Sequence, residues 1–177
     1  MSILKVARMG HPVLRERARP LDRPQIKSAQ IQKLIDNMLE TMLEYRGVGL
    51  AAPQVHEGLR LFVASLDSDE DEEGSERPAP LAIINPEITV VGTDIVEDWE
   101  GCLSIPDIRG RVPRAREVTV RALDRFGERI ELSAHGFPAR VIQHETDHLD
   151  GILFFDRMRS FQSLTFLDEY SRYWLKD

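Results

Sequence analysis

The chain has 177 residues, of which 42% are hydrophobic and 30% are charged, proportions typical of one globular domain with a core of ordinary size. It contains a single cysteine, Cys102, which excludes a secreted disulfide scaffold, and no apolar run approaches the roughly 18 residues of a membrane-spanning helix. The first residues, MSILKVARMGH, lack the apolar centre of a signal peptide. We therefore expect a cytoplasmic protein, with an organelle matrix as the alternative compartment.

The formal net charge of −7 comes from one short stretch. Residues 67–76 (DSDEDEEGSE) hold seven of the 30 acidic side chains and no basic one, so the other 23 acidic side chains balance the 23 basic ones. A neutral body indicates neither a nucleic-acid surface nor a polybasic membrane face. We expect a monomer with no nucleic-acid or membrane partner, and a solvated acidic loop over 67–80.

The first elements predicted along the chain are an irregular arm and a long helix. Residues 1–27 are rich in proline and arginine. Ser28 then has the character of an N-cap, apolar residues follow at helical spacing from Ile31 to Tyr45, and Gly47 stands where a helix commonly ends. We therefore predict a helix between Ser28 and Gly47.

Strands are predicted after this helix. A glycine-rich turn (47–54) leads into an apolar run over 59–66, and residues 81–91 carry a further strand signal. The segment 117–134 is typical of a hairpin that turns at Asp124–Gly127.

A second helix is predicted between Pro138 and Gly151, and a short amphipathic helix over the tail 160–175. Helices and strands do not alternate strictly, which argues against a parallel sheet. We therefore predict one α+β domain over 1–177. Its antiparallel sheets would pack around the second helix, with one helix near each end of the chain.

The strongest chemical signal is HETDH, residues 144–148, inside the second predicted helix. Positions i and i+4 lie on one helical face roughly 6 Å apart, so His144 and His148 can bind one metal ion. Glu145 would then reach a metal-bound water and act as general base.

A catalytic metal needs a third protein ligand. The protease class that extends this motif has a histidine where this chain has Phe154, so that class is excluded. The one thiol, Cys102, stands in EGCLS (100–104), which we predict to be a loop. Its thiolate would complete a Cys-His-His set with one position left for water.

The turn GVGLAA, residues 47–52, formally matches a dinucleotide-binding fingerprint. That fingerprint needs a strand before the glycines and a helix after them. Here a helix precedes, Pro53 follows, and a strand comes next, so the nucleotide interpretation fails. Glycines also let a bound peptide backbone approach closely, and the amide of Gln54 could stabilise an oxyanion.

Three segments, GVGLAAPQ (47–54), EGCLS (100–104) and QHETDHL (143–149), together resemble the signature set of the peptide deformylases. The resemblance extends over essentially the whole chain. It implies a bacterial cytosolic hydrolase that removes the formyl group from the initiator methionine of nascent polypeptides and releases formate. Cys102, His144 and His148 would then hold one divalent metal, with Glu145 as general acid/base.

The resemblance also implies how the substrate is bound. Gln54 and the backbone amide of Leu103 would form the oxyanion site. The peptide would lie extended, like an added strand. The residues implied to contact it are Val48, Gly49, Gly101, Phe137 and Val141, with the His144 ring also in the methionine pocket.

The donor set and the family resemblance point to different metals. A thiolate and two imidazoles suit Zn²⁺, whereas the resemblance implies Fe²⁺, with Zn²⁺, Ni²⁺ or Co²⁺ able to substitute. We expect Fe²⁺. The tail 160–177 is short and slightly acidic, so docking on the ribosome through a basic C-terminal helix is not expected.

Two alternatives remain from the residues. A metallopeptidase that cleaves internal peptide bonds would also use HETDH, but it gives no reason for the glycine turn, Gln54 and EGCLS to occur together. A non-catalytic protein braced by a metal would need four protein ligands, and the sequence offers three candidates.

Overall fold

The computed structural model describes residues 2–66 and 79–175, so most of the predicted acidic loop over 67–80 lies outside the described residues. The helices are Arg23–Ile26 (α1), Ala29–Glu44 (α2), Phe137–Leu149 (α3), Phe154–Arg157 (α4) and Leu167–Tyr173 (α5). Short 3-10 turns are Pro12–Arg15 (η1), Ala52–Val55 (η2) and Phe161–Ser163 (η3). Within the described ranges, no helix has the length and apolar character to cross a membrane.

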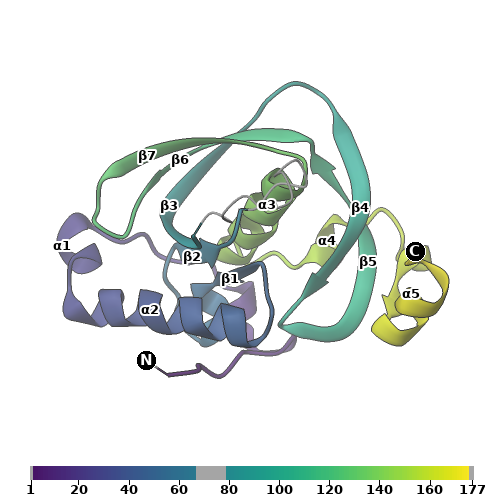
Figure 1. Cartoon of the computed structure of the whole chain (residues 1–177), viewed down its shortest axis with the longest axis horizontal. Helices are drawn as coiled ribbons and strands as arrows, with labels where there is room; N and C mark the ends of the chain where they lie inside the picture. Colours follow the sequence, from purple (N-terminus) through teal and green to yellow (C-terminus); the bar gives the residue numbers. More distant parts are fainter. Residues whose placement is uncertain (1, 67–78, 176–177) are drawn as a thin grey trace.

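The strands form two antiparallel sheets. They are Gly49–Ala51 (β1), Leu61–Ala64 (β2), Leu81–Val90 (β3), Ile95–Cys102 (β4), Ile105–Ala115 (β5), Glu117–Leu123 (β6), Arg129–His135 (β7) and Thr165–Phe166 (β8). One sheet has the order β1-β2-β3-β6-β7 and the other β4-β5-β8. Figure 1 shows α3 between the larger sheet and the β4–β5 hairpin. The predicted α+β class, with antiparallel sheets around the helix that carries HETDH, is therefore confirmed.

A helix covers each face of the larger sheet. Successive side chains of a strand point to opposite faces, so each strand can pack against both helices. In β2, Phe62 and Ala64 point into the cluster that α3 closes, whereas Leu61 and Val63 point into the cluster that α2 closes. All four side chains are fully buried. An apolar run without alternation is typical of a strand buried on both faces, which is why this strand could be read from the sequence.

Helix α2 begins where the sequence predicts. The Ser28 hydroxyl accepts a hydrogen bond from the Ile31 amide at 3.3 Å and so satisfies a free N–H of the first turn. The side chains of Ile35, Met38 and Met42 are fully buried on one face. Their spacing of three and four residues brings them onto the same side of the helix.

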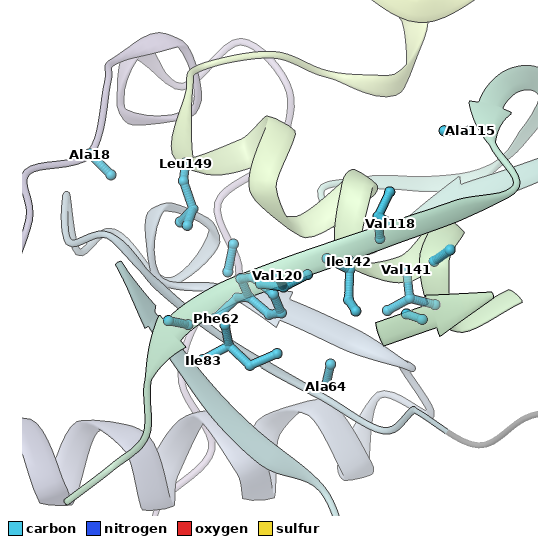
Figure 2. Packing of buried hydrophobic residues seen from close by; sticks show 14 residues of the cluster. Ala18, Phe62, Ala64, Ile83, Ala115, Val118, Val120, Val141, Ile142 and Leu149 are labelled. Carbon is cyan, nitrogen blue, oxygen red and sulfur yellow. The ribbon is translucent and has the colours of Figure 1, made fainter. Parts of the chain in front are cut away.

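Helix α3 is buried more completely than α2, because it lies between the larger sheet and the β4–β5 hairpin. Pro138 stands in its first turn and Gly151 follows its end in the left-handed region, with φ +73°. Ile142 packs with Phe62 and Val120 in the cluster between α3 and the sheet (Figure 2). The predicted helix between Pro138 and Gly151 is thus confirmed within one residue at its start.

The β4–β5 hairpin is the main element that the sequence analysis missed. Within β4 only Glu100 is buried. A strand is usually recognised by alternating apolar residues, but here the buried position holds a carboxylate. The prediction that Cys102 lies in a loop is wrong, because Cys102 is the last residue of β4. A register shift between Glu100 and Cys102 marks an irregularity at this end of the strand, and such shifts re-aim side chains.

Two further predictions need smaller corrections. The glycine-rich turn 47–54 contains strand β1 and the 3-10 turn η2, because three of its residues pair with β2. The tail helix is shorter than 160–175. It is confined to α5, since Thr165 and Phe166 pair with β5 instead.

Gly151 permits a close crossing of the N-terminal arm over the end of α3, and its replacement is predicted to lower stability. A Cβ there would lie 2.6 Å from the Arg15 carbonyl oxygen, on a backbone with φ +73°. Gly92 has nearly the same φ, +70°, but open space around it. We expect Gly92→Ala to cost about 1 kcal/mol for the left-handed backbone. Gly151→Ala should cost about 1–3 kcal/mol more, because the arm must move.

Thermal unfolding of both variants checks this prediction. A difference of 1 kcal/mol shifts Tm by roughly 2–4 °C in a chain of this size. Equal Tm losses for Gly151→Ala and Gly92→Ala would show that the arm does not press on this position.

Candidate active site

Three potential metal ligands meet between β4 and α3. Cys102 ends β4, and His144 and His148 lie one turn apart on α3. Their ligand atoms all lie within 4.8 Å of one another. The Cys102 Sγ lies 3.2 Å from His148 Nε2, and the two imidazole rings have centroids 5.0 Å apart. The structure thus brings together the three side chains that the sequence analysis selected.

Cys102 and His144 stabilise the charged forms of each other. Burial by itself raises the pKa of the Cys102 thiol, but the positive charge of His148 and hydrogen bonds from His144 and His148 outweigh it and hold that pKa well below its ordinary value. Burial lowers the pKa of His144, yet hydrogen bonds to Cys102 and Glu100 raise it well above its usual range. A thiolate beside two imidazoles is a donor set that fits one divalent transition-metal ion.

Glu145 lies beside this cluster on α3 and is almost fully buried. Burial raises the pKa of its carboxyl. Its Oε2 atom has no hydrogen-bond partner among the residues that the structure describes. Gly49 leaves room for it, since a Cβ there would lie 2.4 Å from Glu145 Oε1. A buried, unpartnered carboxyl with a raised pKa is suited to accepting and returning a proton.

Gln54 is held by η2 with its amide turned to the cluster. Its Oε1 accepts a hydrogen bond from the Ala51 amide at 2.8 Å, which fixes the orientation of the side chain. Its Nε2 donates toward Ser104 Oγ at 3.2 Å and Cys102 Sγ at 3.4 Å. Leu103 stands in the turn that follows Cys102. Both residues that were predicted to bind an oxyanion therefore lie next to the sulfur.

A cavity of about 790 Å³ opens onto these groups. It runs between β1 and β4, and each of these strands is the outer strand of its sheet. The lining includes every residue predicted to contact a peptide: Val48, Gly49, Gly101, Phe137 and Val141.

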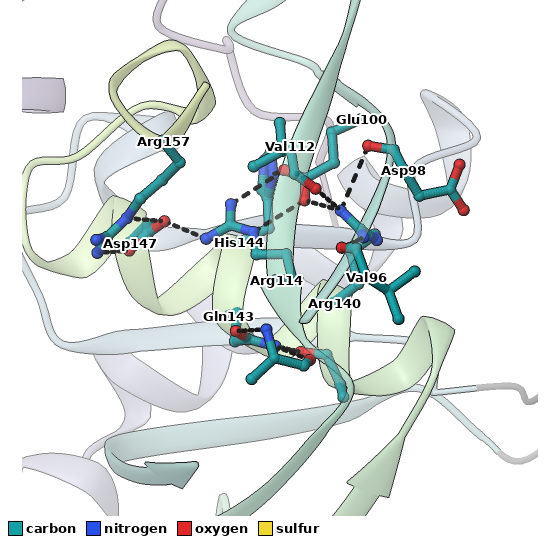
Figure 3. Close-up of polar contacts among 12 residues, drawn as sticks. Val96, Asp98, Glu100, Val112, Arg114, Arg140, Gln143, His144, Asp147 and Arg157 are labelled. Carbon is teal, nitrogen blue, oxygen red and sulfur yellow. Dashed lines mark hydrogen bonds and ion pairs between the residues drawn. The ribbon is translucent and has the colours of Figure 1, made fainter. Parts of the chain in front are cut away.

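A buried charge network, which the sequence analysis missed, supports His144. Glu100 Oε2 lies 2.8 Å from His144 Nδ1. Arg114 on β5 makes two hydrogen bonds to the same carboxylate, at 2.9 and 3.0 Å, and Arg140 on α3 adds one at 2.8 Å (Figure 3). With Nδ1 bonded to Glu100, Nε2 of His144 is the atom left to bind a metal.

The network continues to a second carboxylate. Arg114 also pairs with Asp147, and Arg157 on α4 donates to Asp147 at 2.7 and 3.1 Å. Burial raises the pKa of Glu100, but hydrogen bonds and positive charge from His144 and Arg114 outweigh this and leave the pKa far below its ordinary value. Nothing in the local spacing of these residues indicates the pairing, because Glu100 and its arginines are 14 and 40 positions apart.

Comparison with known proteins gives a consistent result. A family model described as polypeptide deformylase matches residues 3–163, so β8 and α5 lie beyond the match. Peptide deformylase 2 of Nostoc sp. is 41% identical over 168 residues, which cover 95% of this chain and 93% of that protein. The peptide deformylase of Salinibacter ruber is 46% identical over 164 residues, or 90% of this chain and 83% of that protein.

Solved structures agree in fold. A crystal structure of class I type b peptide deformylase from Acinetobacter baumannii is 41% identical with a TM-score of 0.80, and covers 89% of this chain and 100% of that chain. A Met-Ala-Ser-bound structure of the A. baumannii enzyme is 40% identical with a TM-score of 0.80, over 88% of this chain and 98% of that one.

Removal of Arg114 is predicted to lower stability sharply. Arg114→Met leaves two buried carboxylates short of their partner, a change that costs about 3–5 kcal/mol. Arg121→Met is the matched control, because Arg121 pairs with Glu131 at 3.0 Å where both side chains are mostly exposed. Such surface pairs contribute about 0–1 kcal/mol.

Urea unfolding of the two variants compares these costs. If Arg114→Met were no more destabilised than Arg121→Met, the buried network would not be what holds β4 and β5 against α3.

Proposed function

The chain belongs to the polypeptide deformylase family and is a hydrolase of that class, and on this premise we propose its substrate and mechanism. It removes the formyl group from the N-terminal methionine of newly synthesised polypeptides and releases formate. The observation that carries the proposal is the meeting of Cys102, His144 and His148 beside the buried Glu145, at a cavity between two sheet edges.

The proposal includes one divalent ion, held by the thiolate of Cys102 and the Nε2 atoms of His144 and His148. When bound, this ion would lower the pKa of a water molecule and polarise the formyl carbonyl. Fe²⁺ is the proposed ion, with Zn²⁺, Ni²⁺ or Co²⁺ as substitutes. The geometry supports a small cation with nitrogen and sulfur ligands, a preference that these ions share.

The chain's own groups carry the proton and the developing charge. Glu145 takes a proton from the water whose oxygen attacks the formyl carbon, and later returns it to the departing methionine nitrogen as the C–N bond breaks. The Gln54 Nε2–H and the Leu103 N–H donate hydrogen bonds to the oxygen that becomes negative in the tetrahedral intermediate. Formate and a free amino terminus are the products.

The substrate backbone is proposed to lie extended between β1 and β4. Among the residues that the structure describes, no strand pairs with β1 or β4 on the cavity side, and an extended peptide can add to such an edge. Gly49 and Gly101 present no side chain to it. Val48, Phe137 and Val141 line the cavity where the methionine would bind. The Met-Ala-Ser complex of the related A. baumannii enzyme supports a binding site for methionyl peptides.

The proposed setting is the bacterial cytoplasm, with the chain acting as a monomer on nascent polypeptides. Contact with the ribosome through a basic C-terminal helix is not part of the proposal, because α5 carries Asp168 and Glu169 against Arg172. No nucleic-acid or membrane partner is proposed.

Neither alternative from the sequence is favoured. Family membership argues against a peptidase of internal bonds. A metal that only braces the fold needs four protein ligands, and across residues 2–66 and 79–175 the cluster has three.

Glu145→Gln is predicted to lower turnover strongly and keep the metal. The amide preserves the shape of the side chain but cannot accept the proton, so kcat for formyl-Met-Ala-Ser should fall by about 10²–10⁴. Formate release and metal content are measured on Fe²⁺-loaded protein prepared without oxygen. Glu131→Gln, on the exposed face of β7, is the control and should behave as the parent chain does. A metal-replete Glu145→Gln variant with parental kcat would remove this residue from the mechanism.

Cys102→Ser is predicted to weaken metal binding, because the hydroxyl is not deprotonated at neutral pH and is a poorer ligand than a thiolate. Metal content after dialysis measures this. Full occupancy in the variant would show that the thiolate is not a ligand.

A further inference from the structure

Aromatic side chains of the C-terminal segment pack against Trp99, a residue that lines the active-site cavity. Trp99 on β4 contacts Tyr170 edge-on, with ring centroids 4.9 Å apart, and also contacts Trp174, with centroids 5.5 Å apart. We call these three residues the aromatic shelf. Trp99 lines the cavity that holds Cys102, and so does Leu167, the first residue of α5.

The shelf is anchored to the rest of the fold by a short strand. In β8, Thr165 pairs with Arg109 and Phe166 pairs with Ile108, which fixes the start of α5 against β5. The helix then places Tyr170 beside Trp99, and Trp174 follows directly after the helix. The segment therefore contributes to the cavity wall, although it lies beyond the residues that the family model matches.

Position along β4 determines what the shelf can contact. Trp99 precedes Cys102 by three residues, which is about 10 Å along a strand. A substrate whose formyl end lies at Cys102 and which runs along this edge advances about 3.3 Å with each residue. The second or third residue of the substrate therefore reaches Trp99.

We propose that the aromatic shelf binds the side chain of the second or third substrate residue and makes the enzyme prefer an aromatic residue there. This inference rests on the proposed function and deepens it. Aromatic rings pack edge-on or offset against one another. Trp99 is only partly buried and lines the cavity, as Leu167 does, so it can offer such a contact. Trp99 is then a specificity-determining residue, and Tyr170 and Trp174 are positioning residues that hold its ring.

Steady-state kinetics on four formyl tripeptides test the preference. Formyl-Met-Phe-Ala and formyl-Met-Ala-Phe are compared with formyl-Met-Ala-Ala and formyl-Met-Ala-Asp. An aromatic contact of this kind corresponds to about two- to tenfold in kcat/KM. We expect that advantage for at least one Phe peptide, through KM with kcat unchanged, since the contact is equal in the ground and transition states.

Variants separate a binding role from a structural one. Trp99→Ala, or Trp99→Leu if the alanine variant unfolds, should remove the Phe advantage, so that the Phe peptides and formyl-Met-Ala-Ala are hydrolysed with equal kcat/KM. Tyr170→Ala should reduce the advantage in part. Phe126→Ala is the matched control, because Phe126 is an exposed aromatic at the β6–β7 turn, away from the cavity. An equal loss on all peptides in the Trp99 variants would mean that Trp99 is only structural, and would overturn the proposal.

Tryptophan fluorescence gives a readout that does not depend on turnover. The chain has two tryptophans, Trp99 and Trp174, and both belong to the shelf. In Trp174→Phe the emission comes from Trp99 alone. Titration with the product peptide Met-Ala-Phe or Met-Phe-Ala should shift or quench it at lower concentration than Met-Ala-Ala does. Identical titrations for all three peptides would contradict the proposal.

The outcomes separate the aromatic preference from the deformylase function. Formate from every peptide at equal kcat/KM, or fastest from the Asp peptide, would overturn the shelf and leave the deformylase function standing. No formate from any peptide with metal-loaded protein would contradict the proposed function itself. The fluorescence titration would then still report whether the shelf binds aromatic side chains.

Discussion

The buried carboxylate of Glu100 is the constraint on which this structure depends. Its side chain lies in the interior between β4 and α3, where an unpaired charge costs several kcal/mol. Arg114 from β5 and Arg140 from α3 neutralise it, and His144 bonds its second oxygen. A slip of β4 by one residue would turn Glu100 away from all three partners. The same pairing therefore fixes the register of the strand and places Cys102, two residues later, against the histidines.

The candidate site is therefore built on a helix and a strand and not on a flexible loop. The three candidate metal ligands stand on α3 and at the end of β4, and the cavity lies between β1 and β4, each the outer strand of its sheet in the described part of the chain. The two histidines are held unequally. His144 Nδ1 is bonded to Glu100, whereas His148 Nδ1 has no hydrogen-bond partner among the described residues. A disturbance of the charge network therefore changes the orientation of the His144 ring before that of His148.

Local signals explain what could be predicted from the sequence. The N-cap at Ser28, the hairpin at Asp124–Gly127 and the helix around HETDH each depend on residues close together in the chain, and all three are present. The β4–β5 hairpin could not be predicted in this way, because its inward residue is charged and its partners lie far away in sequence. Cys102 was assigned to a loop for the same reason.

The residues of the candidate site also divide into those that local spacing predicts and those that depend on the fold. The spacing of His144 and His148 is local, so the pair could be read directly, whereas the third donor was found because the chain has one thiol. The role of Glu100 needed the fold. It stands in EGCLS beside the predicted ligand, yet no pattern in the sequence indicates which arginines pair with it. Long-range electrostatic pairing leaves no periodic signal of the kind that helices and strands leave.

We propose that Cys102, His144 and His148 share one metal ion. X-ray absorption at the iron edge of the Fe²⁺-loaded chain, prepared without oxygen, tests it most directly, because sulfur and nitrogen neighbours scatter differently. We expect one sulfur and two imidazole nitrogens bound to the iron, with the sulfur lost in Cys102→Ser. An iron environment without sulfur in the parent chain would contradict it.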